Sequence, residues 1–485
     1  MRIERIPVVL NPDRTRVLFR PFAPDDDERC VKIIGRISSL SDREVSDELE
    51  SILSEFKPRH LDLRGFLLNR FHDVERYLLT DSDLSEQRRL LIGAYFTQEY
   101  SLESAALFNP SMVWHPDQSG LAKGSRRFIL SLRALGEGHL SCLTFRSGIV
   151  DAAGTIQVDE PVPHAVFPEI HTDPIYEKEL FEKKLFELNL LQEFTRSVLG
   201  RLEGTFTLRD LEEDIHLMLR QSRTGREDYT DLANGVLALA YANYDVSFDP
   251  TVALSGRVIF PFSPTERKGI EDARFVEFHD EEGKTTYYAT YTAFDGAVIL
   301  PQILETKDFL HFKINTLNGP EVRNKGMALF PRKINDLYAM LSRQDNENIY
   351  LMYSDMPHFW FTKELVIRPT NPWEFVQIGN CGSPIETEAG WLVLTHGVGA
   401  MRKYTLGAVL LDLENPEKVV GRLREPLLSP DEEERNGYVP NVVYSCGGVE
   451  HAGRLIIPYA MSDYASTFAT VDLNELLDTL IRQGP

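Results

Sequence analysis

Apolar residues in the first hundred positions recur at the spacing of helices. Between Ser41 and Phe56 they fall on one face of a predicted helix, and residues 61–79 and 85–95 repeat the pattern. Ser41, followed three positions later by Glu44, is a signal for the start of the first of these helices. We predict that residues 1–103 form a mostly helical N-terminal extension. Because amphipathic helices often bury their apolar stripe against a second subunit, we also predict a homo-oligomer.

Beyond residue 104 the apolar runs become short, as they are in strands. Residues 128–133 and 140–146 are two such runs, and we assign 104–165 to the first part of a β domain. Helical spacing returns over residues 166–230. We interpret this stretch as an insertion in the β domain, and the alternative is a linker between two domains.

Short apolar runs dominate again from residue 231 to residue 485. They lie at 236–241, 287–291, 349–353, 391–395 and 455–459, and turns such as Phe294-Asp295-Gly296 separate them. Many short strands without crossover helices predict an all-β sandwich, barrel or propeller. We expect residues 231–485 to complete the β domain.

The composition is that of a globular protein, with 42% hydrophobic and 26% charged residues among 485. The 52 Lys and Arg against 74 Asp and Glu give a net charge of −22, which argues against nucleic acid or an anionic membrane as a partner. No apolar run approaches the roughly 18 residues of a membrane span. Four scattered cysteines without metal-ligand spacing indicate reduced thiols. We expect a cytoplasmic protein without a metal site.

The most distinctive stretch reads Gly-Ile-Glu-Asp-Ala-Arg-Phe at residues 269–275. It lies at the entrance of a predicted strand, so a rigid sheet could aim Asp272 and its neighbours into a cleft. A carboxyl beside a guanidinium stays charged unless burial opposes it. The plainer interpretation is a surface turn held by an ion pair between Asp272 and Arg274.

Further segments follow residues 269–275 in a characteristic order. They are Tyr-Thr-Ala-Phe-Asp-Gly at 291–296, Lys-Gly-Met-Ala-Leu-Phe-Pro at 325–331, Ile-Gly-Asn-Cys-Gly-Ser-Pro-Ile at 378–385, Gly-Trp-Leu-Val-Leu-Thr-His-Gly-Val at 390–398, Gly-Tyr-Val-Pro-Asn-Val-Val at 437–443, and residues 459–463. In this order the set resembles glycoside hydrolase family 130, the inverting β-mannoside phosphorylases and β-mannosidases. The resemblance covers roughly residues 104–165 and 232–475.

The resemblance implies a mainly β fold, a five-bladed β-propeller with the active site in its central depression. To this fold the chain adds the helical N-terminal extension and the helical insertion. The implied reaction is cleavage of a terminal β-linked mannose from a small oligosaccharide, with inversion and without a cofactor. Asp272 stands at the family's general acid, which is thought to pass its proton through a sugar hydroxyl. Ala273 replaces the proline of the usual Glu-Asp-Pro-Arg motif.

Water and phosphate are both candidate nucleophiles. Phosphorolysis needs a pocket of cations, and the basic residues in the matched segments are Arg133, Lys325, Arg343 and His396. Hydrolysis needs a carboxylate that activates water. Glu386 stands where the resemblance implies a phosphate-contacting lysine, and a carboxylate there would repel phosphate. With Glu434 as a second candidate base, we slightly favour hydrolysis.

The resemblance also implies residues that bind the sugar. These are Asn109, Arg274, Tyr291, Asp295 and Asp463, each of which has a plainer structural role in a turn, an ion pair or the core. Our leading hypothesis is an inverting β-mannosidase. The alternatives are a β-mannoside phosphorylase with phosphate as co-substrate, releasing α-mannose 1-phosphate, and a non-catalytic sugar-binding propeller.

Overall fold

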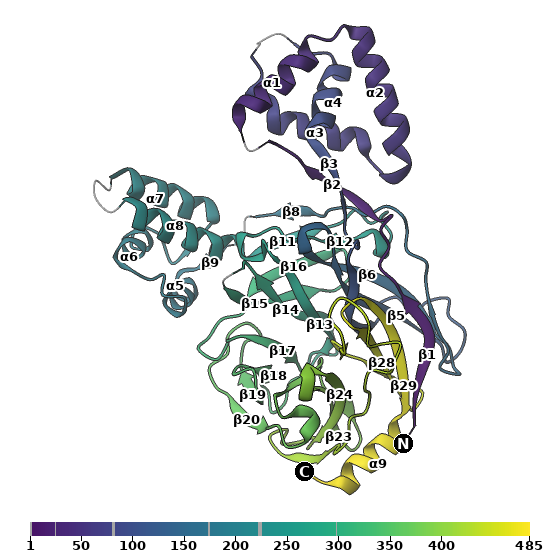
Figure 1. Cartoon of the computed structure of the whole chain (residues 1–485). Coiled ribbons are helices and arrows are strands. Elements are labelled where there is room, and N and C mark those ends of the chain that lie inside the picture. The colour runs from purple at the N-terminus through teal and green to yellow at the C-terminus, as the bar shows by residue number, and fades with distance from the viewer. Residues whose placement is uncertain (1, 25, 80–82, 173–174, 222–225, 297) are drawn as a thin grey trace.

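The computed structural model describes residues 2–24, 26–79, 83–172, 175–221, 226–296 and 298–485 (Figure 1). Its fold is mainly β, as predicted. Two groups of helices stand apart from the sheets, and a third helical element ends the chain. Among the described residues, no helix is both long and apolar enough to cross a membrane. The homo-oligomer stays a prediction.

Most of the strands form antiparallel meanders in which neighbours along the chain pair with each other. The first meander comprises β4 (Ala106–Trp114), β5 (Arg126–Leu135), β6 (Ser141–Val150) and β7 (Ile156–Val158). The second comprises β13 (Gly269–His279), β14 (Thr285–Phe294), β15 (Ile299–Thr306) and β16 (His311–Thr316), with β11 (Tyr244–Ser247) and β8 (Glu169–His171) added at its edge. A parallel bridge between Gly269 and Ser141 joins these two meanders into one sheet.

Three more meanders follow along the chain. The third comprises β17 (Lys325–Leu329), β18 (Tyr338–Arg343), β19 (Ile349–Ser354) and β20 (Glu364–Ile367). The fourth comprises β21 (Gln377–Asn380), β23 (Gly390–Val398), β24 (Tyr404–Leu411) and β25 (Val419–Arg422), with β22 (Ile385–Thr387) paired to β23. The last comprises β26 (Val443–Tyr444), β28 (Arg454–Met461), β29 (Ala465–Asp472) and β1 (Ile3–Leu10), with β27 (Val449–His451) paired to β28.

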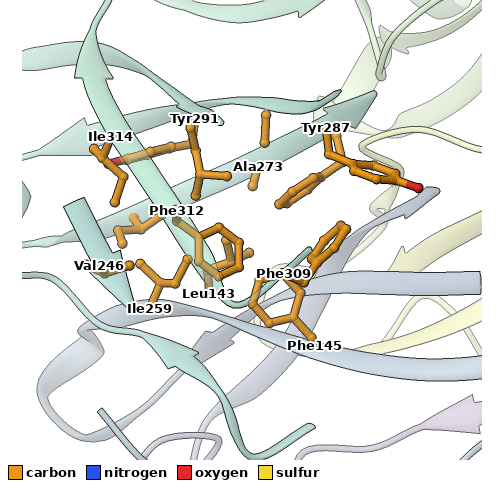
Figure 2. Close-up of a cluster of buried hydrophobic side chains, with 14 of the residues drawn as sticks. Leu143, Phe145, Val246, Ile259, Ala273, Tyr287, Tyr291, Phe309, Phe312 and Ile314 are labelled. Carbon is orange, nitrogen blue, oxygen red and sulfur yellow. The ribbon is translucent and has the colours of Figure 1, made fainter. Parts of the chain in front are cut away.

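Alternate residues of these strands face a packed interior. In the second meander Tyr287 packs in one cluster with Phe145 of β6 and with Phe309 and Phe312 (Figure 2). Phe275 belongs to the same cluster. Their neighbours along the strands point to the opposite face, where Val276 enters a second buried cluster. The core between the sheets therefore holds β13 and its neighbours rigidly, which gives the polar residues of β13 a fixed frame.

The first helical group contains α1 (Asp27–Ser38), α2 (Asp42–Phe56), α3 (Leu63–Val74) and α4 (Glu86–Tyr95), and it stands away from the sheets on the ribbon of β2 (Val17–Pro21) and β3 (Thr97–Ser101) (Figure 1). Ser41 and Glu44 form the predicted capping box at the start of α2. The helices enclose a small core of their own, to which Cys30, Phe71 and Leu91 contribute.

The second helical group contains α5 (Lys178–Glu187), α6 (Glu193–Leu199), α7 (Leu208–Gln221) and α8 (Arg226–Tyr241), together with the two-stranded β9 (Tyr176–Glu177) and β10 (Thr205–Phe206). We predicted a strand at 236–241, and this prediction was wrong. Val236, Leu239 and Ala240 fall on one face of α8 and enter the core of this group, because their spacing suits a helix as well as a short buried strand. At the C-terminus α9 (Leu473–Gln483) packs on β24 and β25.

The N-terminal strand β1 pairs with β29, so the two ends of the chain meet in one sheet. Arg5 of β1 donates to both carboxylate oxygens of Glu434, at 2.9 Å each. The Tyr459 hydroxyl donates to the same carboxylate, and Glu434 is 4% exposed. The ion pair therefore ties β1 to the segment that precedes β26.

Replacing Arg5 by alanine should lower the free energy of unfolding by about 1–3 kcal/mol, because it leaves a buried carboxylate with fewer donors. Urea denaturation measures the change. Arg2→Ala, a change at an exposed position beside the same strand, is the matched control and should leave the midpoint unchanged. Equal midpoints for the Arg5 variant and the wild type would contradict the role assigned to this ion pair.

Candidate active site

A β-bulge near the start of β13 sets the direction of the Asp272 side chain. Glu271 pairs with Thr292 and Arg274 with Thr290, so Asp272 and Ala273 together face one residue of β14. Asp272 has φ of 54°, in the left-handed region that most residues avoid. Bulges re-aim side chains and occur often beside active sites.

The strands β4 and β17 carry the same irregularity at matching places. In β4, Asn109 and Pro110 lie between the paired residues Phe108 and Ser111, and Asn109 has φ of 50°. In β17, the register shifts directly after Lys325. Three neighbouring strands therefore turn polar side chains toward one place.

The side chains that meet there form what we call the Asp272 cluster, comprising Asn109, Arg133, Glu271, Asp272 and Lys325. Asn109 Nδ2 donates to Asp272 Oδ1 at 2.6 Å, and Arg133 Nη1 lies 3.3 Å from the same oxygen. Arg133 Nη2 donates to Glu271 Oε1 at 2.8 Å. Lys325 Nζ lies 3.5 Å from the other Glu271 oxygen. Glu271 therefore contacts both cations. We had assigned no role to this residue, although its position next to Asp272 in the sequence could have indicated one.

Arg274 connects the cluster to neighbouring meanders by hydrogen bonds. Its guanidinium donates to the carbonyl oxygens of Cys381 and Asp272, at 2.8 and 3.0 Å, and to the Tyr444 hydroxyl at 2.8 Å. The side chain is buried. Arg274 therefore links three meanders while its charge stays next to Asp272.

A second pair of basic residues lies beside the cluster. Arg343 pairs with Lys325 across β17 and β18, and its Nη1 lies 3.0 Å from His396 Nε2. Gly379 makes room for this pair, since a Cβ there would come within 2.5 Å of the His396 ring. Burial, reinforced by the charges of Arg343 and Arg274, holds the pKa of His396 well below its ordinary value. His396 is therefore neutral, with Nε2 as acceptor and the proton on Nδ1.

Two acids in the site differ in their affinity for protons. Burial alone would raise the pKa of Asp272, but Arg133, Arg274 and Lys325 outweigh it and hold the pKa below its ordinary value. Asp463, in the turn between β28 and β29, has its pKa raised to about 6 by burial and by the nearby charge of Asp272. Acids with divergent pKa values are characteristic of catalytic sites.

The structure does not bring Glu386 to the Asp272 cluster. Glu386 forms an ion pair with Arg332 at 2.7 Å and lines a cavity together with Trp114 and Glu277. Trp114 lies five residues beyond Asn109 along β4, and Glu277 five residues beyond Asp272 along β13. At about 3.3 Å per residue, Glu386 therefore lies near the opposite end of these strands, roughly 16 Å away.

The remaining candidates also have other contacts. Glu434 is held by Arg5 and Tyr459, as described above. Tyr291 lies in the hydrophobic core (Figure 2), and its hydroxyl donates to Glu266 at 2.6 Å. Asp295 accepts a hydrogen bond from the Val298 amide at 2.7 Å within its turn. The site thus brings together the other predicted residues, which are Asn109, Arg133, Asp272, Arg274, Lys325, Arg343, His396 and Asp463.

Positive charge exceeds negative charge in this site, although the chain carries a net charge of −22. Arg133, Arg274, Lys325 and Arg343 face the carboxylates of Glu271 and Asp272. In the part of the chain that the structure describes, no group of three or more His, Cys, Asp or Glu side chains could hold a metal ion. The arrangement can bind an anion beside a carboxyl group.

Comparison with known proteins agrees with this chemistry. The family profile described as beta-1,4-mannooligosaccharide phosphorylase matches residues 232–482, more than half of the 485 residues. The 1,2-beta-oligomannan phosphorylase of Thermoanaerobacter sp. (strain X514) is 34% identical over 219 residues, which are 44% of this chain and 71% of that protein. The beta-1,2-mannobiose phosphorylase of Listeria innocua serovar 6a is 32% identical over 231 residues, 46% of this chain and 63% of that protein.

The solved structure of the Listeria innocua phosphorylase with beta-1,2-mannobiose is similar over 78% of this chain and 92% of that one. Its TM-score is 0.47 at 22% sequence identity. Membership rests on the family profile and on the Thermoanaerobacter relative. The chain belongs to glycoside hydrolase family 130 and is an enzyme of the type that this family contains.

Proposed function

We propose that this protein is an inverting β-mannoside phosphorylase. Phosphate attacks the anomeric carbon of a terminal β-linked mannose from the face opposite the leaving oxygen. The new bond gives α-mannose 1-phosphate, and a proton goes to the oxygen of the departing sugar. Two relatives that the chain resembles are named phosphorylases of β-1,2-linked mannosides, which favours such a linkage in the substrate.

The observation that carries the proposal is the surplus of cations beside Asp272. Arg343 has a buried Nε that makes no hydrogen bond within the described chain, and Lys325 pairs with it across the strands. Arginine and lysine are the usual partners of phosphate oxygens. Glu386 and Glu434, which we expected to activate water, are engaged by Arg332 and Arg5. Phosphorolysis therefore replaces hydrolysis as the favoured reaction.

Phosphate binding would also favour the protonated form of Asp272, which the general acid requires. In the free site the surrounding cations keep Asp272 ionised, whereas a general acid must carry a proton. A bound phosphate offsets part of the positive charge, and its own negative charge raises the pKa of a nearby carboxyl group. The protonated Asp272 then transfers its proton, through a sugar hydroxyl as the family resemblance implies.

We assign Asn109 and Asp463 to the sugar hydroxyls. Asn109 Oδ1 is buried and accepts no hydrogen bond from the described residues. Asp463 lies close enough to Asp272 for the charge of one to affect the other. Because buried polar atoms need partners, both groups are suited to bind a polyhydroxylated ligand.

We further propose that the five meanders are the blades of a five-bladed propeller. Each provides antiparallel strands in chain order, and β1 completes the last blade beside β29. In this arrangement the bulged strands β4, β13 and β17 lie innermost, and the Asp272 cluster lies in the central depression. The two helical groups are additions to this body, and the four free, buried cysteines favour a cytoplasmic location.

Asp272→Asn should reduce kcat for phosphorolysis of β-1,2-mannobiose by about 10²–10⁴-fold, because the amide cannot donate the acid's proton. Assay of α-mannose 1-phosphate measures the loss. Asp355→Asn, at an exposed position, is the control and should keep wild-type turnover. Unchanged turnover of the Asp272 variant would rule out this carboxyl as the acid.

Arg343→Gln should raise the KM for phosphate by about tenfold or more, the effect of losing one charge-assisted contact, while the KM for the mannoside changes little. Initial rates over a matrix of both substrates separate the two constants. Arg332→Gln removes a cation that pairs with Glu386 and should leave both constants unchanged. Mannose release at the same rate without phosphate would refute phosphorolysis.

Asp463→Asn should stabilise the protein at pH 7.5 while impairing catalysis. The folded-state pKa of about 6 exceeds the unfolded value, so this group costs stability as the pH rises from about 4 to about 6. Above pH 6 the variant should gain about 2–3 kcal/mol at most in free energy of unfolding, and this gain should vanish near pH 4. Urea denaturation at pH 5 and 7.5 measures how the stability gain of the Asp463 variant depends on pH. Asp336→Asn, at another aspartate with a left-handed backbone, is the matched control. Equal gains in the free energy of unfolding at both pH values would contradict the raised pKa of Asp463.

A further inference from the structure

A cavity opens at the ends of β4 and β13 that lie opposite the Asp272 cluster. Its volume is about 300 Å³. Its walls come from the C-terminal halves of β4 and β13 and from the segments that follow β17, β21 and β26. We call it the far cavity. It contains none of the residues of the Asp272 cluster.

Two hydrogen-bond donors line the far cavity without a hydrogen bond to any residue that the structure describes. Arg126 of β5 is half-buried with its guanidinium carbon 4.0 Å from the centre of the Trp114 ring, and it makes no ion pair with any described residue. The Ser383 hydroxyl is buried and has no hydrogen-bond partner among the described residues. Buried polar groups are almost always paired in folded proteins, which makes the Ser383 hydroxyl an exception. Together with the half-buried guanidinium of Arg126, it is a donor that a bound molecule could use.

The cavity offers acceptors as well as donors. Glu277 and Glu450 both line it, and their charges act on Arg126. The Glu277 side chain is 24% exposed, and its partial burial raises the pKa of its carboxyl group. Glu386 lies at the margin in its ion pair with Arg332. Carboxylates thus at least balance the cations here, unlike at the Asp272 cluster, and the cavity does not favour an anion.

Apart from His279, which lies 3.7 Å from the Glu277 carboxylate, the remaining walls are apolar. Trp114, Phe275 and Pro384 are among them, and the backbone of Gly447 closes one side. Gly447 has φ of 131°, a conformation that other residues rarely adopt. Apolar walls with a few convergent donors and acceptors are typical of small-ligand sites, and 300 Å³ is at the small end of their range of about 300–1,000 Å³.

We infer that the far cavity is a second carbohydrate site, which binds one neutral sugar ring. Hydroxyl groups can donate to Glu277 and Glu450 and accept from Arg126 and Ser383, and the apolar C–H face of the ring can pack on the aromatic wall. A metal cation would be repelled by Arg126, and an aliphatic ligand would leave the polar groups unpaired. This inference does not depend on the activity proposed for the Asp272 site.

The test uses crystals of the full chain soaked in D-mannose, together with calorimetric titration of the same sugar. We expect density for a sugar ring in the far cavity in contact with Arg126. Arg126→Ala should weaken this binding at least about tenfold, as expected for loss of a charged hydrogen bond. The rate of phosphorolysis by the same variant should stay within about twofold of the wild-type rate. Arg127→Ala is the matched control, since Arg127 lies next to Arg126 in β5 and donates instead to the Asp117 and Ser119 carbonyl oxygens.

An empty far cavity at saturating mannose would overturn the inference, as would undiminished binding there by the Arg126 variant. Should Arg126→Ala fail to fold, Ser383→Ala removes the other unpaired donor and must weaken the same binding. Density in the far cavity of an enzyme that shows no phosphorolysis would support the second site and refute only the proposed activity.

Discussion

The contact between Asp272 and Arg133 is the interaction on which the site depends. Asp272 belongs to β13, Arg133 to β5 and the bridging Asn109 to β4. A buried carboxyl group would ordinarily take up a proton, and here the neighbouring guanidinium keeps the pKa low. The bulges that aim Asp272 and Asn109 at each other carry left-handed backbone strain, which the surrounding core must hold in place. The chemistry therefore depends on the packing of the sheets beneath it.

The site carries an excess of positive charge, whereas the whole molecule carries an excess of negative charge. Acidic residues outnumber basic ones by 74 to 52, and the resulting field repels anions at long range. Within the site, Arg133, Arg274 and Lys325 are buried or half-buried around two carboxylates, and screening by solvent is weak there. Local arrangement rather than net charge thus sets the electrostatic potential within the site. The far cavity differs from the site in its local charge, because two carboxylates, Glu277 and Glu450, face Arg126 there.

Glu386 shows that a correct family assignment does not by itself place every candidate residue in the site. The residue stands after the Pro-Ile pair of a matched segment, and its acidic character favoured hydrolysis. In the fold it lies in β22, near the ends of β4 and β13 that are remote from Asp272, where it forms an ion pair with Arg332. Glu434 likewise serves a structural purpose, since it binds the N-terminal strand to the end of the chain. Neither carboxylate is available to activate water beside the Asp272 cluster.

The sequence by itself determined the features that depend on neighbouring residues. The capping box of α2, the β-rich body and the family motif with Asp272 and Arg274 could all be predicted, because turn chemistry, periodicity and motif order are local properties. Only the tertiary structure decided the features that depend on contacts between distant segments. It showed 236–241 to be the end of α8, paired β1 with β29 and placed Glu271 between Arg133 and Lys325. The physical reason is that register, burial and charge pairing involve residues far apart along the chain, whose proximity no local pattern encodes.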